Sequence, residues 1–183
     1  MKMNLKSNQF KSFFEEAALN AKCSDLEGFH SLVQQAQKLK VSVIDFVLDE
    51  GVLYEELFLQ RIARDIGMEW TEIDVDLEDV AELKLICGAA LAIRHQVVPM
   101  SFDDGCLTLA CYDPFNLSMR QMITRYIPAK ISFVMASRRN VRSQLSSIYG
   151  VGADTFEKIL EGRDLDVERL LDNDEASVID DDD

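Results

Sequence analysis

Few side chains in this sequence are suited to catalysis. The chain has two histidines, His30 within a predicted helix and His95 where a predicted helix gives way to a strand. Histidine moves protons well near neutral pH, but it needs a partner group held against it. No serine stands in a Gly-x-Ser-x-Gly turn. Both histidines are therefore interpreted as surface or capping residues, and no catalytic residue is assigned.

Three aspartates around a predicted hairpin raise the question of a metal site. Asp103 and Asp104 precede Gly105, and Asp113 precedes Pro114. An Asp-Gly pair is typical of a tight hairpin turn, and the residue before a proline favours extended backbone. Each aspartate thus has a structural role, and no metal site is predicted.

The cysteines indicate a reducing compartment. They are Cys23, Cys87, Cys106 and Cys111, with no CxxC pair and no histidine at zinc-ligand spacing. Residues 1–10 lack the apolar run of a secretory signal, and no stretch reaches the 18 or so apolar residues of a membrane span. We therefore expect a cytoplasmic protein with free thiols.

Nucleotide chemistry is also missing. No Gly-Lys dipeptide occurs, so there is no P-loop. Residues 150–152 read Gly-Val-Gly, but they follow a predicted helix rather than a strand, which makes a dinucleotide site a weak interpretation. The net charge of -14 argues against nucleic acid or an anionic membrane as the main partner. The sequence predicts a non-enzymatic chain without a cofactor.

The negative charge is concentrated at one end of the chain. Residues 151–183 hold 13 acidic and 3 basic residues, a net charge of -10, which leaves -4 for residues 1–150. After Asn173 the chain is acidic and poor in bulky apolar residues, which favours a solvated linker or tail. We divide the chain into an N-terminal helical segment (1–40), a body (41–150) and an acidic tail (151–183).

Hydrophobic residues make up 48% of the chain, enough for a sizeable core. Their spacing predicts helices at the start. We expect a first helix around residues 10–18 and a second from Ser24, which has Glu27 in capping-box position. Further helices are expected at Val43–Asp49, capped by Ser42, at Glu55–Ile66, ended by Gly67, and from Asp76 or Glu78 to Leu85, resuming after Gly88 to Arg94. Short helices are expected at 155–160 and 165–171.

In the second half of the chain the spacing of apolar residues changes from helical to alternating. Residues 70–75 look extended, and three strands are predicted at Val97–Phe102, Cys106–Tyr112 and Lys130–Ala136. Asn116 and Ser137 are expected to cap the helices that follow the second and third strands. The order is strand, hairpin turn, strand, helix, strand, helix. The predicted fold class is α+β: N-terminal helices, then a small three-stranded sheet packed with helices.

The order and spacing of several short motifs resemble the N-terminal domain of type II secretion and type IV pilus assembly ATPases. The matching positions, within a resemblance that covers about residues 42–150, are Val98-Pro99, Gly105, Asp113-Pro114, Ala136-Ser137 and Tyr149-Gly150. Upstream, FVLDEGVLYEELFLQRIARDIGMEW looks like the helix, corner, helix and glycine stop of that family. Residues 151–154 look like its linker to the ATPase domains, which this chain lacks.

The resemblance implies a docking or regulatory domain. Such a domain binds a cytoplasmic or inner-membrane platform protein of the secretion or pilus system and couples it to the motor. It would be peripheral to the inner membrane through that partner, with the ATPase domains in cis if the chain is a fragment. Secretion and pilus assembly are not separated by the sequence.

The resemblance implies cyclic di-GMP sensing as an alternative. Seven positions match the family's ligand motif: Val47, Leu48, Gly51, Val52, Leu53, Phe58 and Ile62. Ser42 stands where the motif has arginine, Ile44 where it has glycine, and Asp65 where it has glutamine. No second copy is found. Arginine would supply charge for a dianionic purine ligand, so protein docking is preferred, and the matched apolar positions are explained equally well by helix packing.

A partner surface is expected on the first segment. Phe10, Phe13, Phe14 and Phe29 recur at helical spacing, which suits contact between a helix and a groove. The alternative is that these rings pack into the body.

Overall fold

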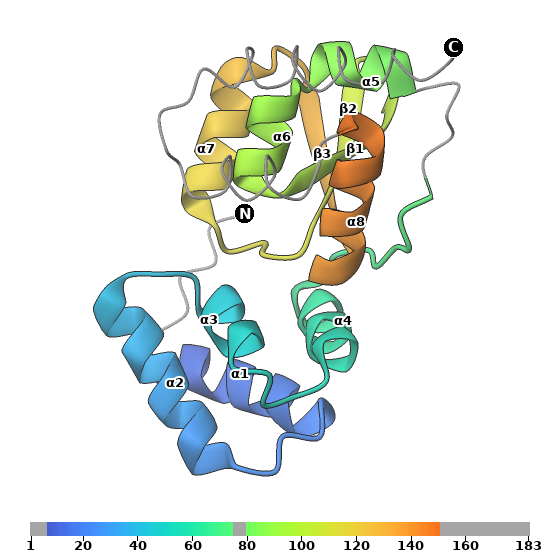
Figure 1. The fold of residues 1–183 in the computed structure, drawn as a ribbon. Helices are drawn as coiled ribbons and strands as arrows, with labels where there is room; N and C mark the ends of the chain where they lie inside the picture. Colours follow the sequence, from blue (N-terminus) through green and yellow to red (C-terminus); the bar gives the residue numbers. More distant parts are fainter. Residues whose placement is uncertain (1–6, 75–79, 151–183) are drawn as a thin grey trace, which may run out of the picture.

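The computed structural model describes residues 7–74 and 80–150, and it confirms the predicted α+β class (Figure 1). The elements in chain order are α1 (Ser7–Asn20), α2 (Leu26–Leu39), α3 (Val43–Asp49), α4 (Glu55–Ile66), α5 (Val80–Ile86), α6 (Ala89–His95), β1 (Val97–Asp103), β2 (Cys106–Cys111), α7 (Leu117–Tyr126), β3 (Lys130–Met135) and α8 (Arg138–Tyr149). None of the described helices is long and apolar enough to cross a membrane.

Helices α1 to α4 pack together at one end of the molecule, which we call the helical lobe (residues 7–66). Amphipathic faces drive this packing, because each helix can bury its apolar stripe only against its neighbours. The rings of Phe14, Phe29 and Phe58 meet at its centre, with centroids 6.2–6.3 Å apart for the two pairs that Phe58 makes. Helices α3 and α4, which the sequence analysis assigned to the body, thus pack with α1 and α2.

Local capping sets the helix ends in this lobe. The Ser42 hydroxyl accepts from the Asp45 amide at the start of α3, as predicted. For α2 the predicted cap is wrong by one residue: Asp25, not Ser24, accepts from the Gly28 amide. A carboxylate accepts this bond as readily as a hydroxyl, so spacing alone did not separate two adjacent capping residues.

The second lobe is built on a three-stranded sheet in the order β1-β2-β3, which we call the sheet lobe (residues 67–74 and 80–150). Strands β1 and β2 are antiparallel, joined by a turn with positive φ at both Asp104 and Gly105, as a two-residue hairpin requires. Strand β3 pairs parallel with β2, so the chain must cross over between them, and α7 makes that crossover. The register shifts between Pro99 and Ser101, where a proline is tolerated.

The predicted extended piece after α4 continues this sheet. Trp70 bridges Met135, with the Met135 amide donating to Glu69 O at 2.7 Å and the Thr71 amide donating to Met135 O at 2.8 Å. The Ile73 amide donates to the Asn140 side chain. The segment that leaves the helical lobe is therefore held against the end of β3 and the start of α8.

Helices α5 and α6 are separated at Gly88, as predicted. The predicted start of α5 at Asp76 or Glu78 and the helices expected at 155–160 and 165–171 lie outside the described residues, as does the acidic tail.

Candidate functional site

The two lobes meet at a polar junction, and the candidate site lies around the residues that form it. Ser42, the cap of α3, donates a hydrogen bond to Asp113 Oδ2 at 2.7 Å. Asp113 follows β2, and its Oδ1 accepts from the Phe115 amide at 3.0 Å. Burial raises the pKa of the Asp113 carboxyl above its ordinary value, and the hydrogen bond from Ser42 offsets part of that rise. A buried polar bond thus links α3 to the carboxyl end of β2.

A second contact across the junction is made by a tyrosine. The buried Tyr112 hydroxyl donates to Asp45 Oδ1 at 2.8 Å. Burial, together with the negative charge of Asp45, raises the pKa of this phenol. Tyr112 therefore stays a neutral donor over the physiological pH range.

An arginine of α8 completes the polar junction. Arg138 Nη1 lies 2.6 Å from Asp49 Oδ1 and 3.5 Å from Asp45 Oδ1. Burial lowers the pKa of this guanidinium, but the hydrogen bond and charge of Asp49 outweigh it, so the pKa lies above its ordinary value. The next residue, Arg139, donates its amide to Glu55 Oε1 at 3.0 Å. The start of α8 is thereby attached to both α3 and α4.

Aromatic rings form a separate contact between the lobes. Phe115, after β2, lies edge-on to Phe13 and Phe14 of α1, with centroid distances of 5.8 and 5.7 Å. Edge-to-face pairs contribute about 0.5–1.5 kcal/mol beyond the area they bury. The junction therefore combines charged, hydrogen-bonded and aromatic contacts.

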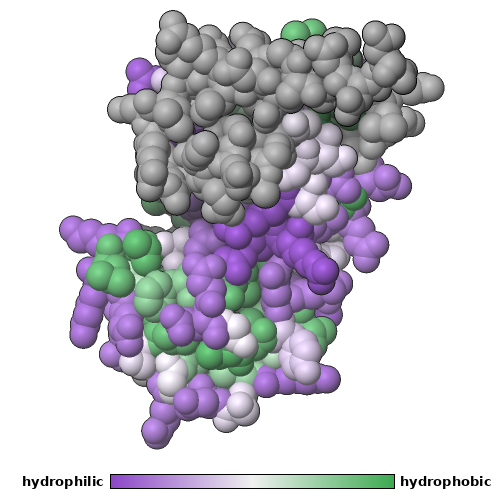
Figure 2. All heavy atoms as spheres, in the orientation of Figure 1, coloured by the Kyte–Doolittle hydropathy of each residue, from purple (hydrophilic) through white to green (hydrophobic). Residues whose placement is uncertain are grey.

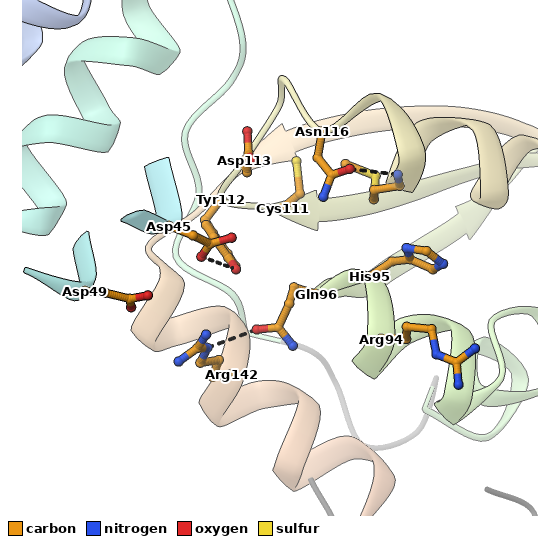
Figure 3. Close-up of a pocket in the computed structure, with 11 residues that line it drawn as sticks. Asp45, Asp49, Arg94, His95, Gln96, Cys111, Tyr112, Asp113, Asn116 and Arg142 are labelled. Atoms are coloured by element: carbon orange, nitrogen blue, oxygen red, sulfur yellow. Dashed lines mark hydrogen bonds between the residues drawn. The ribbon is translucent and has the colours of Figure 1, made fainter. Parts of the chain in front are cut away.

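Two cavities open beside this junction. The first, of about 270 Å³, is lined by Asp45 and Asp49 on the α3 side and by Arg94, His95 and Gln96 at the α6–β1 connection. Figure 3 shows these groups on opposite sides of the space, with Arg142 of α8 hydrogen-bonded to Gln96. Burial and the neighbouring Arg94 lower the pKa of His95, which keeps its imidazole neutral near pH 7.

The second cavity, of about 500 Å³, begins at the end of α2. Gln37, Lys40 and Ser42 line it from the helical lobe, and Asp113 and Phe115 from the sheet lobe. Its position matters because Ser42 stands at the start of the partial ligand motif, where the family has arginine. The cavity carries one cation, Lys40, beside the buried Asp113.

Most of the predicted ligand residues are not accessible. Val47, Phe58 and Ile62 are completely buried, and Leu48 is nearly so, because they form the core between α3, α4 and their neighbours. Gly51 turns the chain with φ of +64°, and the partly buried Leu53 packs on the core. Only Val52 and Gly51 are exposed. The structure thus places the apolar positions of the motif where helix packing requires them.

The expected partner surface of exposed phenylalanines is corrected by the structure. Phe14 and Phe29 are each 1% exposed, and Phe13 is half-buried against Phe14 and Phe115. Phe14 and Phe29 pack against Phe58 of α4, and Phe13 and Phe14 contact Phe115 of the sheet lobe. The packing alternative holds for them. Phe10 belongs to α1, but its side chain lies outside the described residues.

Sequence reasoning missed the residues that join the lobes. Asp45, Tyr112 and Arg138 are unremarkable in sequence, and their partners are 67 to 93 residues away. The one available signal was Asp113, which the sequence analysis explained by its proline alone. Within the described residues no cluster of histidine, cysteine and carboxylate side chains is arranged to hold a metal.

Comparison with known proteins finds a family model that matches the sheet lobe. Residues 66–155 match the model of the MshEN domain, from the last residue of α4 through the sheet and α8. This part of the chain is thus similar to an MshEN domain. The predicted resemblance to the N-terminal domains of type II secretion and type IV pilus ATPases is confirmed. No curated protein matches the chain.

Solved structures extend the likeness beyond the MshEN domain match. MshE with cdg (cyclic di-GMP) superposes with a TM-score of 0.57 at 15% identity, covering 74% of this chain and 98% of that one. The N-terminal domain of XpsE gives a TM-score of 0.58 at 13% identity, covering 79% and 97%. At these identities the shared property is the fold, and because the two structures cover 74% and 79% of this chain, the likeness extends beyond residues 66–155.

Proposed function

We propose that this chain is a non-catalytic docking and regulatory domain of a secretion or pilus assembly ATPase. It binds a platform protein at the cytoplasmic side of the inner membrane and couples that partner to the motor. The MshEN domain and the fold shared with N-terminal domains of such ATPases support this proposal. So does the absence of a P-loop from the sequence.

Three exposed apolar side chains around the α3–α4 connection, which we call the tip of the helical lobe, carry the docking proposal. Tyr54 and Val52, in the α3–α4 connection, are 63% and 40% exposed, and Leu19 near the end of α1 is exposed as well. The connection is fixed on α1, because the Tyr54 amide donates to Ala21 O at 3.1 Å and Lys22 Nζ lies 5.4 Å from the Tyr54 ring centroid. Tyrosine is enriched at the energetic centres of protein interfaces, and apolar surface patches mark such sites.

The junction supplies the coupling that this role needs. A partner bound at the tip pulls on α3 and α4, and both are attached to the start of α8 through Arg138 and Arg139. Gly150, which caps the end of α8, is the last described residue. In Figure 1 the helical lobe lies at the end of the molecule away from α5 and the sheet. Force applied at the tip is therefore carried across the junction into the sheet lobe.

The experiment is an affinity measurement with purified cytoplasmic segments of the platform proteins of a secretion or pilus system, tested one at a time by biolayer interferometry. Val52→Asp with Tyr54→Ala should weaken binding at least tenfold, because a charge and a lost ring remove the apolar centre. The control is Leu85→Asp on α5, since Leu85 is 88% exposed at the other lobe. Unchanged affinity in the tip variant, with its helical circular dichroism intact, would rule out this surface.

Cyclic di-GMP sensing is the second candidate. It is favoured by the fold shared with MshE with cdg and by the 500 Å³ cavity beside the start of the partial motif. Ser42 in place of arginine and the buried Asp113 weigh against it, because both reduce the positive charge offered to a dianion. Calorimetry that detects no heat up to high micromolar ligand removes this candidate. Binding that Lys40→Glu abolishes, and Lys38→Glu does not, would assign the ligand to the cavity.

A further inference from the structure

The charges that follow β2 are separated along the sequence. From Pro114 to Gly150 the chain has no Asp or Glu and six basic residues: Arg120, Arg125, Lys130, Arg138, Arg139 and Arg142. Residues 151–183, which come directly after, carry a net charge of -10. A block of one sign followed by a block of the other favours contact between them, and acidic runs commonly act as interaction segments.

Helix α7 carries two of these six cations, Arg120 and Arg125. Arg120, Gln121, Thr124 and Arg125 line a shallow depression of about 430 Å³. The guanidinium of Arg120 lies 4.7 Å from the Phe133 ring centroid and donates to Pro114 O, and that of Arg125 lies 5.7 Å from the Tyr126 ring centroid. These contacts hold the two groups in place without neutralising them.

No carboxylate compensates this face within the described part of the chain. The ion pairs found there involve His30, Arg61 and Arg138, and neither Arg120 nor Arg125 is in one. Acidic groups of the sheet lobe lie elsewhere, two of them in the hairpin turn at Asp103 and Asp104. The α7 face, defined as Arg120, Gln121, Thr124 and Arg125, is therefore an unpaired basic surface.

We propose that the acidic segment 172–183 of the same chain docks on the α7 face. This segment has seven acidic residues and no basic one. Its only branched apolar pair, Val178-Ile179, stands between two acidic clusters, and Leu117 and Tyr126 at the ends of α7 are exposed. The helical lobe is a poorer site, because residues 7–66 hold 10 acidic and 6 basic residues and repel the segment.

The chain is long enough for this contact. About 22 residues separate Gly150 from Asp172, which spans ~70 Å when extended. A folded domain of this size has a radius of gyration of ~15 Å, so the segment reaches α7 from the end of α8. Each exposed ion pair is weak, but a tethered segment binds at an effective concentration in the millimolar range. The contact is therefore expected to depend strongly on salt, because screening shortens the electrostatic range from ~30 Å at 0.01 M to ~3 Å at 1 M.

The test compares amide spectra of the full chain with those of a variant whose seven acidic residues in 172–183 are changed to Asn or Gln. At 10 mM NaCl the amides of residues 117–126 should shift between the two proteins, and at 1 M NaCl the difference should vanish. Arg125→Glu in the otherwise unchanged chain should produce similar shifts in its neighbours on α7. The matched control, Glu27→Gln with Glu50→Gln, neutralises exposed acids of the helical lobe and should leave α7 unaffected.

Two results would overturn the proposal. One is identical α7 amides in the parent and neutralised chains at 10 mM NaCl, which would show that the segment docks elsewhere or not at all. The other is a shift that grows with protein concentration, which would show that the segment binds a second copy of the chain rather than its own α7. Because neither variant changes Val52 or Tyr54, failure here leaves the proposed docking tip untouched.

Discussion

The helical lobe and the sheet lobe solve the same packing problem in different ways. In the helical lobe four amphipathic helices close around three large rings, Phe14, Phe29 and Phe58, and most of the stabilisation is apolar burial. In the sheet lobe the hydrogen-bonded pairing of three strands positions the backbone. Small or aliphatic side chains such as Leu107, Leu109 and Ala110 form the core.

The contact between the lobes resembles neither interior. It is a half-buried junction of hydrogen bonds, ion pairs and one aromatic cluster, and hydrophilic side chains gather between the lobes on the face shown in Figure 2. Polar contacts of this kind fix orientation more than they add stability. The comparison indicates two well-packed bodies whose relative placement depends on a few named side chains.

The largest expected effect tests whether the lobes unfold together. Phe58→Ala in the helical lobe should cost about 3–5 kcal/mol, because it leaves a cavity among buried rings. Trp70, the single tryptophan, packs beside β3 and reports the sheet lobe. If the junction makes the lobes cooperative, urea titration should show the Trp70 fluorescence midpoint falling together with the helical circular dichroism. A shift in circular dichroism alone would mean that the lobes unfold separately.

A smaller effect isolates the junction. Arg138→Ala leaves Asp45 and Asp49 without their cation, and it should lower the free energy of unfolding by about 1–3 kcal/mol. Arg61→Ala is the control, since Arg61 pairs with Glu16 and Asp65 within the exposed surface of the helical lobe and should cost under about 1 kcal/mol. Equal losses for the two variants in urea titrations would mean that the junction is no stronger than a surface ion pair.

Acidification should increase the stability that Asp113 contributes to the folded protein. Burial raises the folded-state pKa of Asp113, so the folded protein holds that proton more tightly than the unfolded chain does. This group therefore makes the protein less stable as the pH rises from its unfolded pKa towards its folded pKa. Relative to Asp113→Asn, the parent protein should gain stability between pH 7 and pH 4.5, measured by urea unfolding at both values. A parent-variant difference that stays constant with pH would contradict the raised pKa.

The smallest expected effect is a difference in reaction rate between thiols of the sheet lobe. Burial raises the pKa of Cys87 to about 11 and that of Cys111 to about 12, and both side chains are inaccessible. Cys106 is only half-buried, at the edge of the hairpin. At pH 8 Cys106 should therefore react with a disulfide reagent at least about tenfold faster than the two buried thiols, because the thiolate is the reactive form. Cys106→Ser should remove the fast phase, and its persistence would locate a reactive thiol elsewhere.

Much of the fold was predictable because its signals are local. The Asp-Gly turn, the caps at Ser42, Asn116 and Ser137 and the change from helical to alternating periodicity all act within a few residues. The strands begin and end within one residue of their predicted limits. A cap or a turn depends on its own neighbours, so the sequence around it carries the information.

The candidate site could not be predicted in the same way. Whether Phe14 and Phe29 face solvent or the core depends on where α4 and Phe115 lie, and helical spacing is the same in both cases. Val47, Phe58 and Ile62 satisfy a ligand pattern and a packing pattern equally in the sequence, and only the structure shows that they are buried.

By itself, then, the sequence determined the order of the elements, the α+β class, the missing P-loop and the separation of charge between residues 114–150 and 151–183. Only the tertiary structure decided that Ser42 meets Asp113 and that Arg138 meets Asp45 and Asp49, across 71 to 93 residues of chain. The physical reason is that these bonds are set by how two separately packed lobes come together. The periodicity, caps and turns near each of these residues carry no information about where the other lobe lies.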